Sequence, residues 1–294
     1  MGAAVRAARS ETAQRARAKV NLWLNVVGRR GDGYHLLDSL VAFADLADTV
    51  EVSTSDGLSL AFDGPATAPG AAALSAEPDN LVLKAARLLA ERAGVAPHAA
   101  LRLAKNIPVA AGLGGGSADA AAALRALVDL WRLRLSEQEL FELAASLGAD
   151  VPMCLAGRTS FVSGVGERLG TAPALPPCAI LLVNPGVSLS TGEVFAARRG
   201  DFSTSRPLAR PWSGMSEFVE ILSERGNDLT PTAVSLRPVI GEVLSFLGAT
   251  DGARYTAMSG SGATCFALYA TVADARHAAA HLPQAWWRHA GTFA

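Results

Sequence analysis

Four glycines lie within five residues of a loop, Gly112-Leu113-Gly114-Gly115-Gly116, directly before an alanine-rich segment. Glycine has no Cβ atom, so the backbone N–H groups of such a loop can approach a ligand closely. The alanine-rich segment predicts a helix, and its N-terminus adds unpaired N–H groups and the positive end of a dipole. This combination predicts an anion site, for which phosphate is the usual ligand.

The spacing of these glycines excludes two common nucleotide-binding loops. No Lys-Ser or Lys-Thr pair follows them, so the segment is not a mononucleotide P-loop. Ser117 stands where the dinucleotide fingerprint requires its last glycine, which argues against a nicotinamide-dependent oxidoreductase. The alternative to an anion site is a hinge before a helix, with Ser117 as an ordinary N-cap.

Polar and apolar residues alternate over 19–27, which predicts a β-strand. Lys19, Asn21, Trp23 and Asn25 share one face, where polar groups about 7 Å apart can reach one ligand. The alternative is an edge strand with a solvated face. A second glycine cluster at 259–263 is also explained by a tight hairpin, and it gains weight only as a partner of the first loop.

Asp150 precedes Val151-Pro152, which is equally typical of a helix N-cap and of an acid–base group. His277 and His281 lie four residues apart on a predicted helix without an acidic third ligand, which favours a solvated helix face over a metal pair. Cys154, Cys178 and Cys265 are widely separated, so neither a disulfide framework nor a zinc cluster is expected.

The remaining patterns place the elements around these residues. Helices are expected over 80–93, with Asp79 as cap and Gly94 as stop, from the capping box at 136–139, and from residue 272. Strands are expected at 58–62, 99–103 and 179–183 and on both sides of the second glycine cluster. The proline-rich stretch 173–177 predicts a domain boundary, giving domains 1–173 and 174–294. The N-terminal arginines, Arg6, Arg9, Arg15 and Arg17, favour a floppy basic tail, with an Arg-rich transit peptide as the alternative.

The overall charge favours a small-molecule ligand. The 26 Lys and Arg residues nearly cancel the 27 Asp and Glu residues, leaving a net charge of -1. The protein therefore has no long-range attraction for nucleic acid or an anionic membrane, and no apolar run approaches the roughly 18 residues of a membrane span. A soluble, cytoplasmic protein is expected, which holds any anionic ligand by local donors.

These segments together resemble the motifs of the GHMP kinase superfamily. The resemblance rests on 18–24, on the turn Gly31-Asp32-Gly33-Tyr34-His35, and on the run from Gly114 to Ala120, whose triple glycine differs from galactokinase-like and mevalonate-kinase-like members. Segments 147–152, 164–167 and 184–188 also match, and the likeness spans about residues 15–270. Ala110 and Ala111 stand where glycines are common, and the tail after Tyr269 does not align securely.

The resemblance implies a fold and an activity. The fold is α+β, with a domain like ribosomal protein S5 domain 2 followed by a ferredoxin-like domain. The activity is a phosphotransferase reaction that moves the γ-phosphoryl group of ATP, with Mg²⁺, to the 2-hydroxyl of 4-diphosphocytidyl-2-C-methyl-D-erythritol, in the non-mevalonate pathway of isoprenoid (terpenoid) biosynthesis. The implied partners are these small molecules, not nucleic acid or membrane, and the enzyme would be a monomer or homodimer.

The same resemblance implies roles for individual residues. Asp150 corresponds to the general base and Lys19 to its basic partner. Tyr34 and Phe195 correspond to an aromatic pair that sandwiches cytosine, His35 to the residue that reads its polar edge, and Asn21 to a substrate contact. The ATP phosphate loop comprises Pro108, Val109, Ala110, Ala111, Gly112, Leu113, Gly114, Gly115, Gly116, Ser117 and Ala118. The ligands of the metal ion are not fixed.

Two rival functions stay open at the level of sequence. Another GHMP kinase, acting on homoserine, mevalonate or a sugar, would share the loop, but the Tyr34-His35 turn and Phe195 argue against it. A non-catalytic nucleotide-binding sensor would share the pocket, but it would not need both Lys19 and Asp150.

Overall fold

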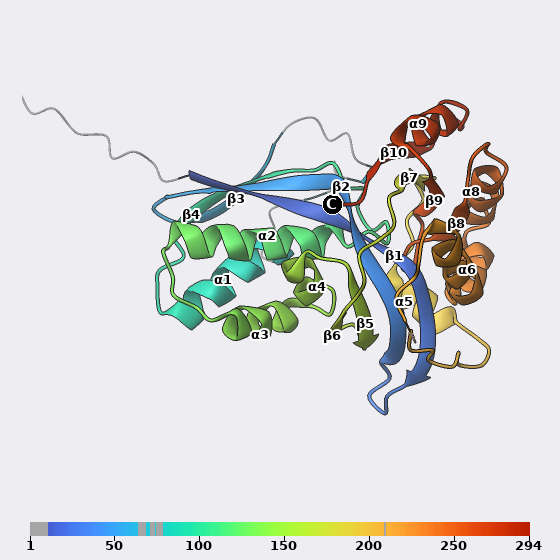
Figure 1. The fold of residues 1–294 in the computed structure, drawn as a ribbon. Coiled ribbons are helices and arrows are strands. Elements are labelled where there is room, and N and C mark those ends of the chain that lie inside the picture. Colours follow the sequence, from blue (N-terminus) through green and yellow to red (C-terminus); the bar gives the residue numbers. More distant parts are fainter. Residues whose placement is uncertain (1–10, 64–68, 71–73, 75–78, 209) are drawn as a thin grey trace, which may run out of the picture.

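The computed structural model describes residues 11–63, 69–70, 74, 79–208 and 210–294, and it contains two β-sheets with helices packed on them (Figure 1). The first sheet has six strands in the order β3-β4-β2-β5-β6, with β1 paired to β2. All its pairs are antiparallel except β3 with β4. Its strands are β1 (Glu11–Arg29), β2 (His35–Ser53), β3 (Leu58–Asp63), β4 (Ala99–Ala104), β5 (Ser160–Gly164) and β6 (Arg168–Thr171).

The second sheet has four antiparallel strands in the order β10-β7-β9-β8. Its strands are β7 (Ala179–Asn184), β8 (Tyr255–Met258), β9 (Cys265–Tyr269) and β10 (Trp287–Thr292). Helices pack around it: α5 (Thr191–Ala197), α6 (Met215–Arg225), α7 (Thr230–Leu236), α8 (Val239–Gly248) and α9 (Val272–Ala280). The α+β fold expected from the sequence is thus confirmed, as are the expected strands at 58–62, 99–103 and 179–183.

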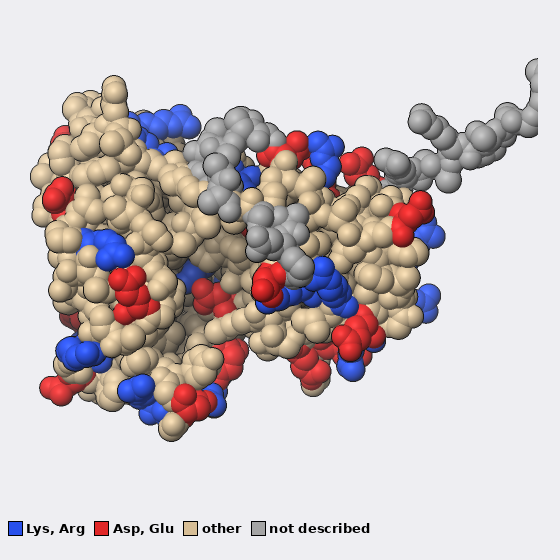
Figure 2. Space-filling view, turned by 180° about the vertical axis from the view of Figure 1, so that it is seen from behind, with Lys and Arg blue, Asp and Glu red and all other residues tan. Residues whose placement is uncertain are grey.

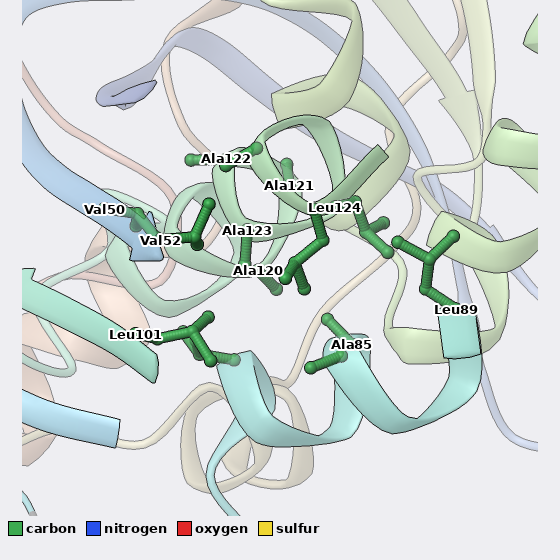
Figure 3. Packing of buried hydrophobic residues seen from close by; sticks show 14 of the residues in the cluster. Val50, Val52, Ala85, Leu89, Leu101, Ala120, Ala121, Ala122, Ala123 and Leu124 are labelled. Carbon is green, nitrogen blue, oxygen red and sulfur yellow. The ribbon is translucent and has the colours of Figure 1, made fainter. Parts of the chain in front are cut away.

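A layer of helices covers one face of the first sheet (Figure 1): α1 (Leu81–Ala93), α2 (Gly115–Leu130), α3 (Glu137–Leu147) and α4 (Val151–Ala156). Figure 3 shows side chains of α1 and α2 meeting those of β2 and β4, with Leu89 and Leu124 fully buried among alanines. Small alanine side chains let α2 lie close to its neighbours, and each fully buried leucine contributes about 1.5–3 kcal/mol. This packing fixes the start of α2.

The helix ends follow local capping chemistry, with one correction to the sequence prediction. Asn80, not Asp79, caps α1, because its side chain accepts a hydrogen bond from the Val82 N–H at 3.0 Å. Asp79 instead forms an ion pair with Lys84 at 2.9 Å. The stop at Gly94 is confirmed by its left-handed backbone, and the capping box at the start of α3 is also confirmed.

Strand β1 is longer than the sequence predicted, and its alternation is broken by shifts in register against β2. The alternative of an edge strand with a solvated face is excluded at Lys19 and Asn21, which are 6% and 4% exposed. The predicted floppy tail is also wrong for Arg15 and Arg17, which belong to β1, while Arg6 and Arg9 lie outside the described residues.

The hairpin of β1 and β2 joins the two sheets. Ala16 and Val50 pack in the cluster beneath the helical layer, whereas Leu24 and Val26 pack in the cluster of the second sheet. A third cluster combines residues of β1 and β2 with those of β7 and β9. The predicted boundary after residue 173 falls between the two sheets, but this shared core leaves the division into two domains a prediction.

A set of contacts near the end of the chain, here called the clip, also links the two sheets; it joins Asp45 and Phe43 of β2 to His289 and Ala294. The His289 Nε2 atom lies 2.8 Å from Asp45 Oδ1, and the Ala294 N–H donates to the Phe43 carbonyl at 2.8 Å. Thus β10, which pairs with β7, is held to β2 of the other sheet. Within the described part of the chain, none of the helices combines the length and apolar character that a membrane crossing requires.

Candidate active site

The two glycine segments lie against each other. The Ser259 hydroxyl donates to the Gly112 carbonyl at 3.0 Å, and the Thr264 N–H donates to the Ala111 carbonyl at 3.2 Å. Gly112 has a φ of 75°, and a Cβ atom there would lie 2.8 Å from the Gly262 carbonyl oxygen. Only glycine allows this backbone contact, so the second cluster is a structural partner of the first loop.

Helix α2 begins with free backbone donors. Its N-cap is Gly114, in the left-handed conformation and without a side-chain cap bond, so the alternative in which Ser117 is an ordinary N-cap is wrong. The first bond of the helical ladder runs from the Ala118 N–H to the Gly114 carbonyl at 2.8 Å. The N–H groups of 115–117 precede that ladder, and together with the helix dipole they are the arrangement that the predicted anion site requires.

Lys19 is fixed beside this helix start. Its backbone N–H donates to the Leu113 carbonyl at 2.9 Å, and a Cβ atom on Gly114 would lie 2.6 Å from its Cγ. The Lys19 Nζ atom donates to Asn21 Oδ1 at 2.7 Å and lies 3.4 Å from Asp150 Oδ2. The lysine side chain is 7% exposed, whereas the aspartate side chain is 39% exposed.

Asp150 is the N-cap of α4, but its side chain makes no capping hydrogen bond. The residue therefore occupies the predicted cap position, while its carboxylate pairs with Lys19 and not with the helix amides, and its acid–base role stays a prediction. A carboxylate held by one ammonium group at the edge of a cavity retains acceptor sites for the proton of a substrate hydroxyl.

Asn21 orients its neighbours. Besides accepting from Lys19, its side-chain Nδ2 donates to the Ser39 hydroxyl at 2.9 Å, and its backbone N–H donates to the Ser259 hydroxyl at 3.1 Å. The Ser39 hydroxyl in turn donates to the Trp23 carbonyl at 2.5 Å. This chain of hydrogen bonds connects β1, β2 and the second glycine cluster around the lysine.

A cavity of about 430 Å³ contains these groups. A second cavity of about 600 Å³ adjoins it, and both are lined by Leu37, Ser117, Asp150, Thr191 and Phe195. In Figure 2 the surface is hollowed between the two parts of the molecule, with basic and acidic atoms at the base of the hollow. Most of the predicted phosphate loop lines the first cavity: Ala110, Ala111, Gly112, Gly114, Gly115, Gly116 and Ser117.

Four residues of that predicted loop do not line the cavity. Leu113 and Ala118 are buried in the hydrophobic core at 0% and 2% exposure. Pro108 is buried as well, and Val109 bonds through its N–H to the Pro69 carbonyl at 2.9 Å. The predicted contact of these four residues with the phosphates therefore stays a prediction.

An aromatic group lines the second cavity. The rings of His35 and Phe195 stack with centroids 4.9 Å apart, while Tyr34 is 64% exposed at the rim. Burial lowers the pKa of His35, and the positive charges of Arg29 and Arg198 lower it further, so the imidazole is neutral at pH 7. A neutral imidazole offers one donor and one acceptor, which suits the edge of a base.

Two residues of this region were missed from the sequence. Phe202 meets His35 edge-on at 6.5 Å, and the Arg198 guanidinium lies 5.3 Å from the centre of the Phe202 ring. They follow α5 in a segment without regular structure, where no periodic pattern marks them. The Phe195-Ala-Ala-Arg198 spacing, one turn of helix, was the only available signal.

The fold and the glycine-loop site define a class of small-molecule kinase. The model for the GHMP kinases N terminal domain matches residues 80–158, and the model for the GHMP kinases C terminal domain matches residues 208–289. Similarity to known proteins is also close. A 4-diphosphocytidyl-2-C-methyl-D-erythritol kinase of Paramagnetospirillum magneticum is 54% identical, over 92% of this chain and 95% of that protein.

Solved structures agree with the sequence comparison. The crystal structure of a 4-(cytidine 5'-diphospho)-2C-methyl-D-erythritol kinase is 38% identical, with a TM-score of 0.78 over 96% of this chain and 99% of that one. A homoserine kinase from Cytophaga hutchinsonii shares the fold, with a TM-score of 0.71 over 99% of this chain and 98% of that one, at only 17% identity. The chain belongs to the GHMP kinases and, within them, to the 4-diphosphocytidyl-2-C-methyl-D-erythritol kinase family.

Proposed function

We propose that this chain transfers the γ-phosphoryl group of ATP to the 2-hydroxyl of 4-diphosphocytidyl-2-C-methyl-D-erythritol, a step of isoprenoid precursor synthesis. The observation that carries the chemistry is the Lys19–Asp150 pair, 3.4 Å apart, in the cavity that the free amides of α2 also line. The family assignment carries the choice of substrate. Membership of the GHMP kinases supports ATP as the phosphoryl donor.

In the proposed reaction, the substrate hydroxyl oxygen attacks the γ-phosphorus atom and the bond to the β,γ-bridging oxygen breaks, releasing ADP. Asp150 accepts the hydroxyl proton, and Lys19 stabilises the negative charge near the transferring group. The amides of 115–117 hold the phosphates in place. Phosphoryl transfer depends mainly on such positioning and charge neutralisation.

Magnesium fits this site as an ion carried by the nucleotide. Among the described residues, no group of three or more His, Cys, Asp or Glu side chains is placed to hold a metal ion. Mg²⁺ typically keeps several waters and binds through substrate phosphates with one or two carboxylates, so such a site does not need a protein cage. When bound, the ion would neutralise charge on the phosphates.

The second cavity provides the proposed base site. Phe195 and His35 form its inner wall and Tyr34 lies at its rim, so cytosine would bind by stacking and by hydrogen bonds to the neutral imidazole. Because this cavity shares Asp150 with the first one, a substrate anchored by its base can extend its sugar-alcohol end to the reacting carboxylate.

The test is an ADP-release assay with three acceptors. We expect turnover with 4-diphosphocytidyl-2-C-methyl-D-erythritol and at least 100-fold lower kcat/KM with homoserine or mevalonate, since a site built around a base leaves its polar groups unpaired with smaller substrates. CMP should compete with the acceptor and not with ATP. Efficient turnover of homoserine would refute the proposed substrate, and ATP binding without turnover of any acceptor would favour the sensor.

A further inference from the structure

A buried ionic cluster lies beneath the phosphate loop and takes no part in the proposed chemistry. The Lys105 Nζ atom donates to Asp48 Oδ2 and, at 2.7 Å, to Asp119 Oδ2. The three side chains are 6%, 0% and 4% exposed. Buried charges of this kind are costly unless their geometry is well satisfied, so the cluster needs an explanation beyond its own stability.

The cluster joins both ends of the phosphate loop. On the entry side, Asp48 Oδ1 accepts the N–H groups of Asn106 at 2.5 Å and Ile107 at 2.8 Å, immediately before Pro108. On the exit side, Asp119 belongs to the first turns of α2. Lys105 connects the two carboxylates, so one ammonium group ties the strand that leads into the loop to the helix that leaves it.

The ammonium group lies directly behind the phosphate-binding amides. A Cβ atom placed on Gly115, the first residue of α2, would lie 3.4 Å from Lys105 Nζ. A positive charge in this position supports anion binding at the helix start, provided the two carboxylates do not cancel it.

The protonation of Asp119 matters for that balance. Burial raises the pKa of Asp119 and the nearby Asp48 carboxylate raises it further, while Lys105 opposes both effects. Its Oδ1 atom is buried without a hydrogen-bond partner among the described residues, as expected for a carboxyl that does not carry full charge. With Asp119 protonated, the cluster is neutral; with both carboxylates ionised, it would place a net negative charge beneath the phosphates.

Resting on the proposed function, we infer that Lys105, Asp48 and Asp119 are positioning residues for ATP: the cluster holds the entry and exit of the phosphate loop in the geometry that binds the triphosphate. The base site lies on β2 and α5 and does not depend on it. The alternative is a purely structural cluster, whose loss would weaken the whole fold without a preference for one ligand.

The discriminating pair of variants is at Asp119. Asp119→Leu removes the link from Lys105 to α2 while leaving Lys105 paired with Asp48, whereas Asp119→Asn keeps a neutral side chain that accepts the Lys105 hydrogen bond. Calorimetric titration with the ATP analogue AMP-PNP should give at least about tenfold weaker binding for D119L, the effect of a lost hydrogen bond to a charged group. D119N should recover most of that affinity.

Two controls separate positioning from general damage. CMP titrated into each variant should bind as it does to the wild type, because the stacking residues His35 and Phe195 lie at the start of β2 and on α5, outside the segments that the cluster joins. Arg102→Met breaks an ion pair with Asp63 that is about half exposed, near the same end of β4, and should leave both affinities within about twofold.

A measurement on the unaltered protein does not depend on any variant folding. Adding AMP-PNP should slow amide hydrogen exchange in 105–107 as well as in the loop, since the inference makes them one unit. The inference fails if that segment is unaffected, if D119L binds AMP-PNP like wild type, if D119N is no better than D119L, or if AMP-PNP and CMP affinities fall together. Absence of AMP-PNP binding to the wild type would instead refute the proposed function.

Discussion

Asp150 and Lys19 form an ion pair in the cavity, but their surroundings differ. The lysine is enclosed by Asn21, the Gly114 backbone and the strand that carries it, so its position is set by the fold. The aspartate side chain is more open to solvent and makes no capping bond, so it can exchange its partner for a substrate hydroxyl. One residue is held in place, and the other is free to react.

Replacing Asp150 with Asn is expected to lower kcat by about 10²-fold or more, the range for a lost general base. The affinity for AMP-PNP should stay near that of wild type, because the amides of α2 do not depend on this carboxylate. Steady-state kinetics and calorimetry check the two halves of the prediction. Asp56→Asn, at an exposed position outside both cavities, is the matched control. A D150N enzyme with normal turnover would remove Asp150 from the mechanism.

At the scale of elements, the docking of the two glycine segments has a measurable consequence. Gly112→Ala forces a Cβ atom against backbone carbonyls of the second cluster, in a left-handed conformation that only glycine adopts easily. We expect a loss of about 1–3 kcal/mol in the free energy of unfolding, the usual cost of overpacking, together with weaker binding of AMP-PNP. Urea titration and calorimetry measure these effects.

Gly57→Ala is the control for that variant, because a Cβ atom there would meet no other atom within 4 Å. If G112A matched G57A in stability and nucleotide binding, the contact between the two clusters would carry no energetic weight. A loss of stability with unchanged AMP-PNP affinity would place the docking in the fold but outside the nucleotide site.

The buried cluster also predicts how stability depends on pH. Because the pKa of Asp119 is raised in the folded protein to about 8, the folded state holds this proton more tightly than the unfolded state does. Its contribution to stability is complete below the unfolded value of about 3.9 and is lost as the pH rises toward 8. The free energy of unfolding of D119N, relative to that of wild type, should therefore increase as the pH rises. Denaturant titrations across this range measure this difference.

A constant difference between D119N and wild type across this range would contradict the raised pKa. Lys105 and Asp48 are the charged groups that face Asp119, and both are kept in this comparison.

Local patterns predicted most of the elements and the position of the glycine loop before α2. Glycine spacing located the loop, and the capping box located α3, because both depend on contacts within a few residues. The sequence could not foresee that β1 is buried on both faces, since this depends on the second sheet packing against it. The Lys105 cluster could not be predicted for the same reason, because Asp48, Lys105 and Asp119 are brought together only by the tertiary fold.

The family resemblance supplied the roles of individual residues, which local sequence patterns left open. Asp150 alone was as consistent with a helix cap as with a base, and the resemblance favoured the base. The structure adds the contacts: Asp150 with Lys19, and Phe195 with His35. The substrate roles of Asn21, Tyr34, His35 and Phe195 stay predictions, as do the oligomeric state and the cytoplasmic location.

At the scale of the whole molecule, the clip between Asp45 and β10 is expected to support both sheets. Burial raises the pKa of Asp45, but hydrogen bonds from His289 and Thr292 outweigh it, so the pKa is lowered overall. Asp45→Asn should reduce the free energy of unfolding by about 0.5–1 kcal/mol at pH 7, a small value because the pair is partly exposed. The deficit should disappear as the pH falls through the folded-state pKa, below about 3.9.

Thermal or denaturant unfolding of D45N at several pH values measures this effect. Asp63→Asn, which breaks a pair between adjacent strands of one sheet, should have a smaller effect. A D45N deficit that did not shrink as the pH was lowered below about 3.9 would show that the carboxylate charge is not its source.

The β1–β2 hairpin carries Lys19 on one arm and His35 near its turn, and its residues pack with both sheets (Figure 1). The Lys19 ammonium and the His35 imidazole, for which we propose roles at the reacting groups and at the base, therefore lie on one continuous β-hairpin. For the proposed substrate, the hairpin would set the distance between the base site and the reacting groups. A conjugate with one phosphate fewer in its linker would occupy the base site, but its hydroxyl would not reach the γ-phosphate. Substrate selectivity would then depend on the length of the conjugate as well as on recognition of its base.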